Sequence, residues 1–315
     1  MLRYLKNPVI TRKDLKLKHH ALQDVSSVFN PGGVWHEGAF LLLLRVQNRA
    51  RETFFVKAVS HDGISFEISD QPVAIHHLER CPHHIYHIYD ARITPDKAGY
   101  YHIFCAMDTS AGCYLGYFRS VDFVAMDFLG IASQADVRNG VLLSGTRYRF
   151  ERPNNHILPN GVKTGSHIIC SESEDMLSWH PVGELFAGRS HYWDELIGSG
   201  PPPLLCNEGW LHLYHGVATH FGSSNIYQAG ISLQDRDKPW QTLARGRYNI
   251  LEPRELYETT GQVPNVVFPS AAIPVDPKPV LDNDTPIYIY YGAADTCVAL
   301  AITTVKELLA QARAE

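Results

Sequence analysis

Several charged and amide side chains interrupt apolar, strand-like segments at places where a purely structural strand would carry hydrophobic residues. They are Arg45, Arg51, Asp90, Arg138, Asn139, Arg152, His215 and Asp295. An unpaired charge is costly to bury, so such residues either pair with one another or face a water-filled pocket. Any one of them alone could be a structural ion pair or a turn carboxylate. Their recurrence in successive strand pairs favours one shared ligand-binding pocket.

Other chemistries have little support in the sequence. Five histidines at positions 76, 77, 83, 84 and 87 show no regular ligand spacing and have no cysteine pair beside them, so no metal is expected. The glycine-rich turns lack both the GxGxxG and the P-loop patterns, and no GxSxG elbow is present. The sequence therefore predicts no bound cofactor.

The elements that position these residues are short strands. Apolar segments rich in Tyr, Phe, Val, Ile and Leu are separated by Gly, Pro, Asn and Asp, which is typical of β-structure. Only residues 304–314 (TVKELLAQARA) follow a helical pattern, with Val305, Leu308, Leu309 and Ala312 on one face.

The strands recur as five units. The strand segments are 39–46 with 53–60, 100–107 with 113–120, 166–170, 209–217 with 225–233, and 286–293 with 297–303. A turn that contains serine or threonine and an acidic residue follows most units, and an aromatic or apolar residue comes next. Repeats of roughly 45–75 residues with several strands each are typical of propeller blades. The sequence predicts an all-β chain in which residues 1–315 form a single five-bladed β-propeller catalytic domain with a short C-terminal helix. From the strand signals alone, an irregular double-sheet fold remains an alternative.

Composition restricts the partners and the compartment. The formal net charge is −5 and no basic stripe stands out, so we expect neither nucleic-acid binding nor a membrane partner. The first twenty residues lack the apolar core of a secretory signal, and six scattered cysteines without a CxxC pair are expected to be free, buried thiols. We expect a cytoplasmic protein. A homo-oligomer stays open.

Nine short stretches together resemble one enzyme family. They are residues 28–32 (VFNPG), 42–46 (LLLRV), 58–66 (AVSHDGISF), 90–94 (DARIT), 197–203 (IGSGPPP), 209–216 (GWLHLYHG), 250–253 (ILEP), 263–269 (VPNVVFP) and 290–295 (YYGAAD). In this order they are similar to glycoside hydrolase family 130, the β-mannoside phosphorylases and β-mannosidases.

The resemblance implies a five-bladed propeller that inverts the anomeric carbon of a terminal β-mannosyl unit in a mannose-containing oligosaccharide. The family's catalytic acid falls on Asp90. The positions that hold the mannosyl ring fall on Asn30, Arg45, Arg51, Tyr89 and Asp295.

The family divides according to the nucleophile that attacks the sugar. In phosphorylases a cationic cradle holds inorganic phosphate, and by resemblance it falls on Arg138, Arg152, position 196 and His215. Position 196 is Leu196, where phosphorylases usually carry lysine, and their VLFPEK stretch is shortened here to residues 141–145 (VLLSG).

A carboxylate next to the missing lysine favours hydrolysis. Glu195 is acidic, and an inverting hydrolase needs a second carboxylate about 6.5–9.5 Å from the acid to deprotonate water. The sequence therefore predicts an inverting, exo-acting β-mannosidase with Asp90 as acid and Glu195 as base, and the departures resemble the β-1,2-mannosidase branch. Glu151 is the second candidate base. Glu195 could instead be a surface carboxylate that follows a buried Trp193.

Two alternatives remain. One is a phosphorylase that uses inorganic phosphate as co-substrate and produces mannose 1-phosphate, which the retained Arg138, Arg152 and His215 favour. The other is a non-catalytic mannoside-binding propeller, which would not need Asp90. Trp193 and the dipeptide 220–221 (HF) are expected to shape the acceptor side, because aromatic faces stack on sugars.

Overall fold

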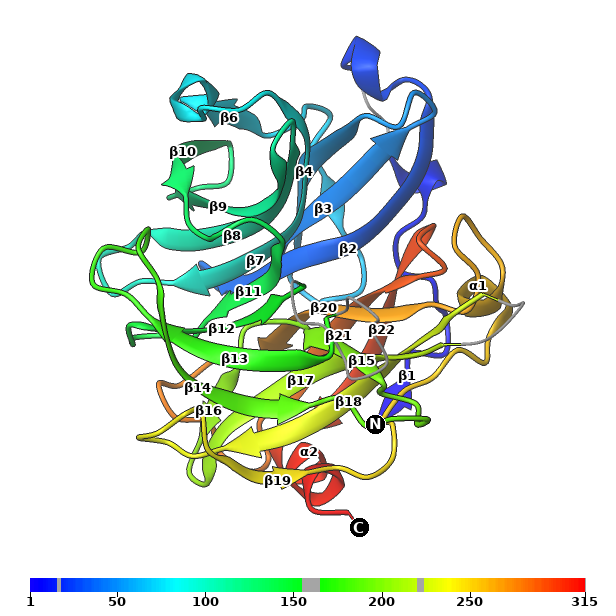
Figure 1. Ribbon diagram of the computed structural model, residues 1–315. Helices are drawn as coiled ribbons and strands as arrows, with labels where there is room; N and C mark the ends of the chain where they lie inside the picture. Colours follow the sequence, from blue (N-terminus) through cyan, green and yellow to red (C-terminus); the bar gives the residue numbers. More distant parts are fainter. Residues whose placement is uncertain (16–17, 155–164, 220–223, 315) are drawn as a thin grey trace.

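Five sheets surround a common axis, one for each sequence repeat (Figure 1). The computed structural model describes residues 1–15, 18–154, 165–219 and 224–314. One edge strand of each sheet lies innermost, and these strands contact one another: β2 contacts β7 and β20, and β11 contacts β7 and β15. The predicted five-bladed propeller is confirmed.

Each blade is a sheet of four or five strands. Blade 1 consists of β2 (Val25–His36), β3 (Ala39–Asn48), β4 (Thr53–Ser60) and β5 (Glu67–Ile68). Blade 2 consists of β7 (Ile85–Pro95), β8 (Tyr101–Thr109), β9 (Gly112–Ser120), β10 (Ala125–Ile131) and β6 (Ala74–His76). Blade 3 consists of β11 (Val137–Leu142), β12 (Tyr148–Pro153), β13 (His167–Glu172) and β14 (His180–Ala187).

The last two blades complete the ring. Blade 4 consists of β15 (Leu196–Ser199), β16 (Leu204–Cys206), β17 (Gly209–Ala218), β18 (Ile226–Gln234) and β19 (Thr242–Arg245). Blade 5 consists of β20 (Val267–Pro274), β21 (Pro286–Ala293), β22 (Cys297–Thr304) and β1 (Leu2–Arg3). The helical elements are three 3-10 turns, η1 (Arg12–Asp14), η2 (His20–Leu22) and η3 (Leu78–Arg80), and the helices α1 (Leu256–Thr259) and α2 (Val305–Ala312). The strand pairs predicted from the sequence agree with these bounds to within about two residues.

Blade 5 contains both ends of the chain. Its outermost strand is β1, which pairs antiparallel with β22 so that Leu2 faces Ile302 and Arg3 faces Ala301. The Arg3 guanidinium also donates to the buried carboxylate of Glu258, with Nε 2.8 Å from Oε1. The sequence repeat gave no sign of this first strand, because two residues are too short to carry an alternating pattern.

The acidic turns that close the units share one hydrogen-bond pattern. In blade 1, Asp62 Oδ1 accepts hydrogen bonds from the Ile64 and Ser65 amides, each at 2.8 Å. In blade 3, Asp175 Oδ1 accepts from the Leu177 and Ser178 amides in the same way. These bonds lower the pKa of Asp62 to about 2. The acidic residues of the repeat are therefore structural caps of the outer turns.

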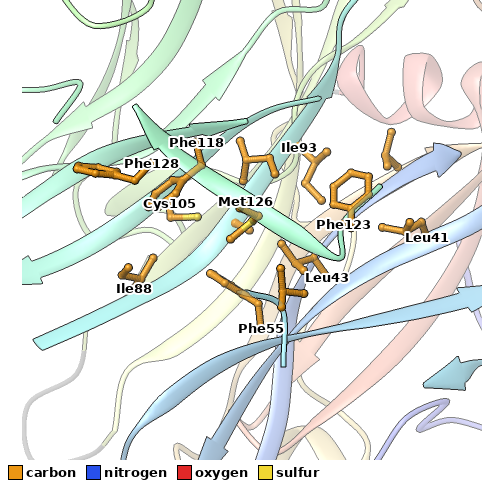
Figure 2. Close-up of a cluster of buried hydrophobic side chains, with 14 of the residues drawn as sticks. Leu41, Leu43, Phe55, Ile88, Ile93, Cys105, Phe118, Phe123, Met126 and Phe128 are labelled. Carbon is orange, nitrogen blue, oxygen red and sulfur yellow. The ribbon is translucent and has the colours of Figure 1, made fainter. Parts of the chain in front are cut away.

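Hydrophobic side chains fill the spaces between blades. Figure 2 shows Leu41, Leu43 and Phe55 of blade 1 packed against Ile93 and Phe118 of blade 2. The AFLLLLRV run is apolar without alternation because both faces of β3 are covered by neighbouring blades.

The predicted C-terminal helix is confirmed as α2. Its buried residues, Val305, Leu308, Leu309 and Ala312, are those expected from the periodicity. The helix packs against the core between blades 4 and 5.

Candidate active site

A central pocket of about 280 Å³ opens among the inner strands and receives side chains from all five blades. Its lining residues are Asn30, Arg45, Tyr89, Asp90, Ala106, Arg138, Asn139, Arg152, His215, Tyr227, Val263, Val266, Phe268 and Asp295. Apart from Arg51 and Glu195, every site residue predicted from the sequence lies in this lining.

In three blades, a β-bulge in the inner strand directs a polar side chain into the pocket. The inner strand of blades 1, 2 and 3 bulges against its neighbour, and Asn30, Asp90 and Asn139 are located at the bulges. Their φ angles are 42°, 55° and 54°, in the left-handed region that asparagine and aspartate tolerate better than other non-glycine residues. A bulge redirects a side chain that a regular strand would point into the packing between blades. The repeated bulge therefore directs three polar side chains to one pocket.

Asp90 is held by two donors from blade 1. Its Oδ1 accepts a hydrogen bond from Arg45 Nη1 at 2.8 Å and from Asn30 Nδ2 at 3.2 Å. The Arg45 guanidinium lies between the rings of Phe29 and Tyr89, 4.5 Å from each centroid. Arg45 is therefore fixed by packing, and it fixes the Asp90 carboxylate in turn.

Asp295 supplies a second carboxylate from the turn between β21 and β22. Its φ is 49°, so it adopts the left-handed conformation as well. Burial raises the pKa of Asp295 to about 6, and the Asp90 charge adds to this, whereas Arg45 opposes it. We define Asp90, Asp295, Arg45 and Asn30 as the carboxylate half of the pocket.

The opposite side is cationic, and we define Arg138, Arg152 and His215 as the anion recess. Arg152 donates from Nη1 to the Ile197 carbonyl at 3.3 Å and from Nε to Asn154 Oδ1 at 2.9 Å. Burial, together with the Arg138 charge, lowers the pKa of Arg152 to about 10, so the guanidinium stays charged at neutral pH. Among the described residues, no carboxylate forms an ion pair with Arg152. The recess therefore presents a cation that no described carboxylate neutralises.

His215 is neutral and its tautomer follows from its neighbour. Burial, and then the Arg152 charge, lowers the pKa of His215 well below its ordinary value. Its Nε2 lies 3.4 Å from Arg152 Nη1, and a guanidinium can only donate, so Nε2 accepts and Nδ1 carries the proton. Within the described part of the chain, His215 Nδ1 and Asn139 Oδ1 are buried without hydrogen-bond partners. These atoms remain available to a ligand.

Tyr89 connects the two sides of the pocket. Its ring packs on Arg45, and its hydroxyl accepts from Arg138 Nη1 at 3.1 Å and donates to Asp108 Oδ1 at 3.0 Å. Asp108 is 3.9 Å from Arg138 Nη2, so it partly balances that guanidinium. The carboxylate half and the anion recess are therefore joined by one rigid phenol.

Two glycines leave room for these side chains. A Cβ on Gly198 would lie 2.6 Å from Asn139 Oδ1 and 2.7 Å from His215 Nε2, and a Cβ on Gly292 would lie 1.9 Å from Asn30 Oδ1. All three distances are well inside van der Waals contact. Gly198, the first glycine of the IGSG stretch, is thus required because the side chains of Asn139 and His215 lie too close to leave room for a Cβ.

Comparison with known proteins decides the family. The sequence model of glycoside hydrolase family 130, described as beta-1,4-mannooligosaccharide phosphorylase, matches residues 4–313. The chain belongs to glycoside hydrolase family 130. The membership inferred from the nine stretches is confirmed.

Two curated relatives of this family 130 chain and one similar solved structure are named phosphorylases. A beta-1,4-mannooligosaccharide phosphorylase of Ruminococcus albus is 31% identical, over 98% of this chain and 89% of its own. A beta-1,2-mannobiose phosphorylase of Thermoanaerobacter sp. is 29% identical, over 91% of this chain and 92% of its own. The solved complex of Listeria innocua beta-1,2-mannobiose phosphorylase with beta-1,2-mannobiose is 25% identical, has a TM-score of 0.81, and the match covers 99% of this chain and 98% of that one.

Glu195, the predicted base of this family 130 chain, lies outside the pocket lining. Its Oε2 accepts a hydrogen bond from Thr219 Oγ1 at 2.5 Å. The preceding Asp194 is fully buried and is bound by Arg189, Arg245 and Tyr214, so it anchors the loop that leads into β15. Leu196, next in sequence, is also absent from the lining.

Glu151, the second candidate base, is a buried structural residue. It accepts hydrogen bonds from Arg149 and, at 2.6 Å, from Ser171 Oγ. It lies on β12 opposite the bulge of β11 and is not among the residues that line the pocket. Its carboxylate is therefore occupied by structural partners.

Two other residues that were expected to contact the substrate, Arg51 and Trp193, do not line the central pocket. Arg51 is exposed at the tip of the β3–β4 hairpin and lines a separate cavity. Trp193 packs across Gly216 and Gly230, stacks on Tyr214 and donates to the Arg247 carbonyl at 2.9 Å, so it has a structural role. Residues 220 and 221 lie outside the described residues.

Sequence reasoning missed the apolar wall of the pocket and one phenol. Val263, Val266 and Phe268 face the polar side chains, and Tyr227 of β18 lines the pocket near His215. The VPNVVFP stretch was recognised only as a family motif, because a valine or phenylalanine gives no chemical signal. Such a wall can pack against the apolar face of a sugar ring.

The described residues contain no group of three or more His, Cys, Asp and Glu side chains arranged to hold a metal. All six cysteines are free, and five of them are buried as predicted, whereas Cys81 is partly exposed. Within the described residues, no helix has both the length and the apolarity that a membrane crossing requires.

Proposed function

We propose that this chain is a phosphate-dependent β-mannoside phosphorylase, with Asp90 as the general acid and the anion recess as the phosphate site. The observation that carries the proposal is the unneutralised Arg152 beside Arg138 and the His215 Nδ1–H donor. A buried charge requires a counter-charge, and guanidinium groups match phosphate oxygens in geometry. The phosphorylase names of relatives at 31% and 29% identity support the same reading.

The halves of the pocket perform the two parts of the reaction. The terminal mannosyl ring binds between them, against Asn30, Arg45, Asp295 and the apolar wall. A phosphate oxygen held in the anion recess attacks the anomeric carbon as the bond from that carbon to the leaving oxygen breaks. Asp90 gives its proton to the leaving oxygen, so the configuration is inverted and mannose 1-phosphate is formed. The product phosphate then returns a proton to Asp90.

An inverting β-mannosidase is the second candidate, because position 196 is leucine and Glu195 comes next to it. For hydrolysis, Glu195 would have to leave Thr219 and reach a water on the recess side. The phosphorylase proposal needs no such movement.

The test is product analysis with and without inorganic phosphate. β-1,2- and β-1,4-mannobiose are each incubated with the protein, and mannose and mannose 1-phosphate are quantified. We expect mannose 1-phosphate only when phosphate is present, and the preferred disaccharide identifies the linkage. Free mannose formed equally well without phosphate would overturn the proposal.

Glu195→Gln is the matched control variant. It keeps the size and the Thr219 contact but removes the charge. Phosphorolysis should continue at a similar rate, whereas a hydrolase that uses Glu195 as base would lose about 10²–10⁴-fold.

A further inference from the structure

A second cavity, of about 480 Å³, lies between blades 1 and 5. Its lining residues are Arg12, Ser26, Gln47, Asn48, Arg49, Arg51, Gly261, Gln262 and Thr296. None of these residues belongs to the central pocket.

The second cavity shares walls with the central pocket. Val263 and Asp295 line the central pocket, and their chain neighbours Gln262 and Thr296 line the second cavity. The same two backbone segments therefore contribute to the walls of both spaces.

Hydrogen bonds between the blades fix the floor of the second cavity. Gln262 donates from Nε2 to Gln47 Oε1 at 2.6 Å and accepts from Ser27 Oγ at 3.0 Å. The backbone N–H of Gln262 donates to Thr296 Oγ1 at 2.8 Å. These groups are held before any ligand arrives.

Three guanidinium groups surround this floor. Arg49 pairs with Asp24, with Nε 2.8 Å from Oδ1, whereas Arg12 and Arg51 form no ion pair within the described residues. The backbone holds both of the latter: Arg12 begins the capped turn η1, and Arg51 has a φ of 65° in the β3–β4 hairpin. Like charges gathered around one hollow repel each other unless an anion lies among them, and guanidinium groups prefer carboxylate and phosphate.

The geometry of an inverting reaction predicts which side of the pocket the leaving saccharide occupies. Inversion requires the nucleophile and the leaving group to lie on opposite faces of the sugar. The anion recess belongs to blades 3 and 4, and in a ring of five blades the position opposite is blade 1. The leaving saccharide therefore departs toward the side of the second cavity.

We propose that the second cavity binds the carboxylate or phosphate group of an acidic saccharide on the leaving-group side. This inference rests on the proposed function for its direction, but its binding can be measured without turnover. It gives Arg51 a different role from the ring contact that the family resemblance implied.

Binding is tested by calorimetry in an Arg152→Gln background, which removes the anion recess as a competing site. The probes are glucuronate, mannose 6-phosphate, mannose and inorganic phosphate. Both acidic sugars should bind, and Arg12→Gln should weaken them about tenfold or more, as expected for a lost hydrogen bond to a charged group. Lys13→Gln removes the same charge one residue away, outside the lining, and should leave the affinity unchanged.

Three results would overturn the inference: equal affinity with and without Arg12, the same loss in Lys13→Gln, or binding of inorganic phosphate without binding of either acidic sugar. The last result would define a site for a free anion.

Turnover separates this inference from the proposed function. With mannose 1-phosphate as donor, glucuronate and mannose are compared as acceptors, and Arg12→Gln should lower the acidic-to-neutral ratio of kcat/KM about tenfold. If no mannosyl transfer or phosphorolysis occurs while the acidic sugars still bind through Arg12, the proposed function fails and the site stands. If phosphorolysis occurs and the ratio does not change, the site fails alone.

Discussion

The two halves of the central pocket differ in how completely the protein balances their charges. In the carboxylate half, Asp90 is bound by Arg45 and Asn30, and that cation is packed between two rings. In the anion recess, Arg152 has a histidine, an amide and a carbonyl as neighbours, and no described carboxylate. A balanced half orients a proton donor, whereas an unbalanced half attracts a charged reactant. This contrast is the one that the proposed phosphorylase requires, because its phosphate would supply the missing negative charge.

Asp90→Asn should break the carboxylate half with the largest effect. Asparagine tolerates the left-handed backbone at the bulge and still accepts from Arg45, but it cannot supply a proton. We expect kcat to fall by about 10²–10⁴-fold while mannobiose binding is retained. Steady-state rates, calorimetry and a melting curve check this. A fall of less than tenfold would remove Asp90 from the role of acid.

Arg152→Gln should break the other half selectively. The loss of a charged donor to phosphate is expected to raise the KM for phosphate by about 10–100-fold and to leave the KM for mannobiose nearly unchanged. Initial rates are measured over a matrix of both substrates. An equal rise in both KM values would mean that the recess holds sugar instead of phosphate.

Gly198→Ala should disturb the anion recess and leave the carboxylate half of the central pocket unchanged. The new Cβ would press on Asn139 and His215, so the recess must shift. We expect the KM for phosphate to rise about tenfold, which corresponds to about 1.4 kcal/mol of lost binding. An unchanged phosphate KM together with a weaker mannobiose KM would contradict this assignment.

Asp295→Asn should give the smallest effect, on stability. Because the folded pKa of Asp295 is raised to about 6, the folded state binds this proton more tightly than the unfolded chain. Its carboxylate therefore destabilises the fold above pH 6, and the penalty disappears as the pH falls toward 4. At pH 7 the melting temperature of the variant should be about 2–4 °C higher than that of wild type. At pH 4 the two proteins should have the same melting temperature. A difference that does not depend on pH would contradict the shifted titration.

The sequence predicted the blades well because strand patterns and capped turns are local. The apolar strand pairs and the helix after Thr304 follow from periodicity, and the acidic turns carry their own hydrogen bonds. The first strand was missed, since β1 has two residues and its partner is near the other end of the chain.

Residue type predicted which side chains line the central pocket better than it predicted the chemical role of each side chain. Asn30, Asp90 and Asn139 were recognised as polar interruptions, but the bulges that direct them depend on pairing between strands. Glu195 is predicted as base because it lies next to Leu196, where phosphorylases usually carry lysine, whereas the loop that carries it is held by the contacts of buried Asp194 with Arg189 and Arg245. Such contacts, distant in sequence, cannot be deduced from neighbours along the chain.

The pairing of β1 with β22 has a consequence for synthesis. Leu2 and Arg3 pair with Ile302 and Ala301, which follow all the other blades in the sequence, so this pairing forms only after those blades have been synthesised. Asp295 lies directly before β22, so the carboxylate half is completed only when the ring closes. A nascent chain that has not reached blade 5 therefore lacks an assembled central pocket.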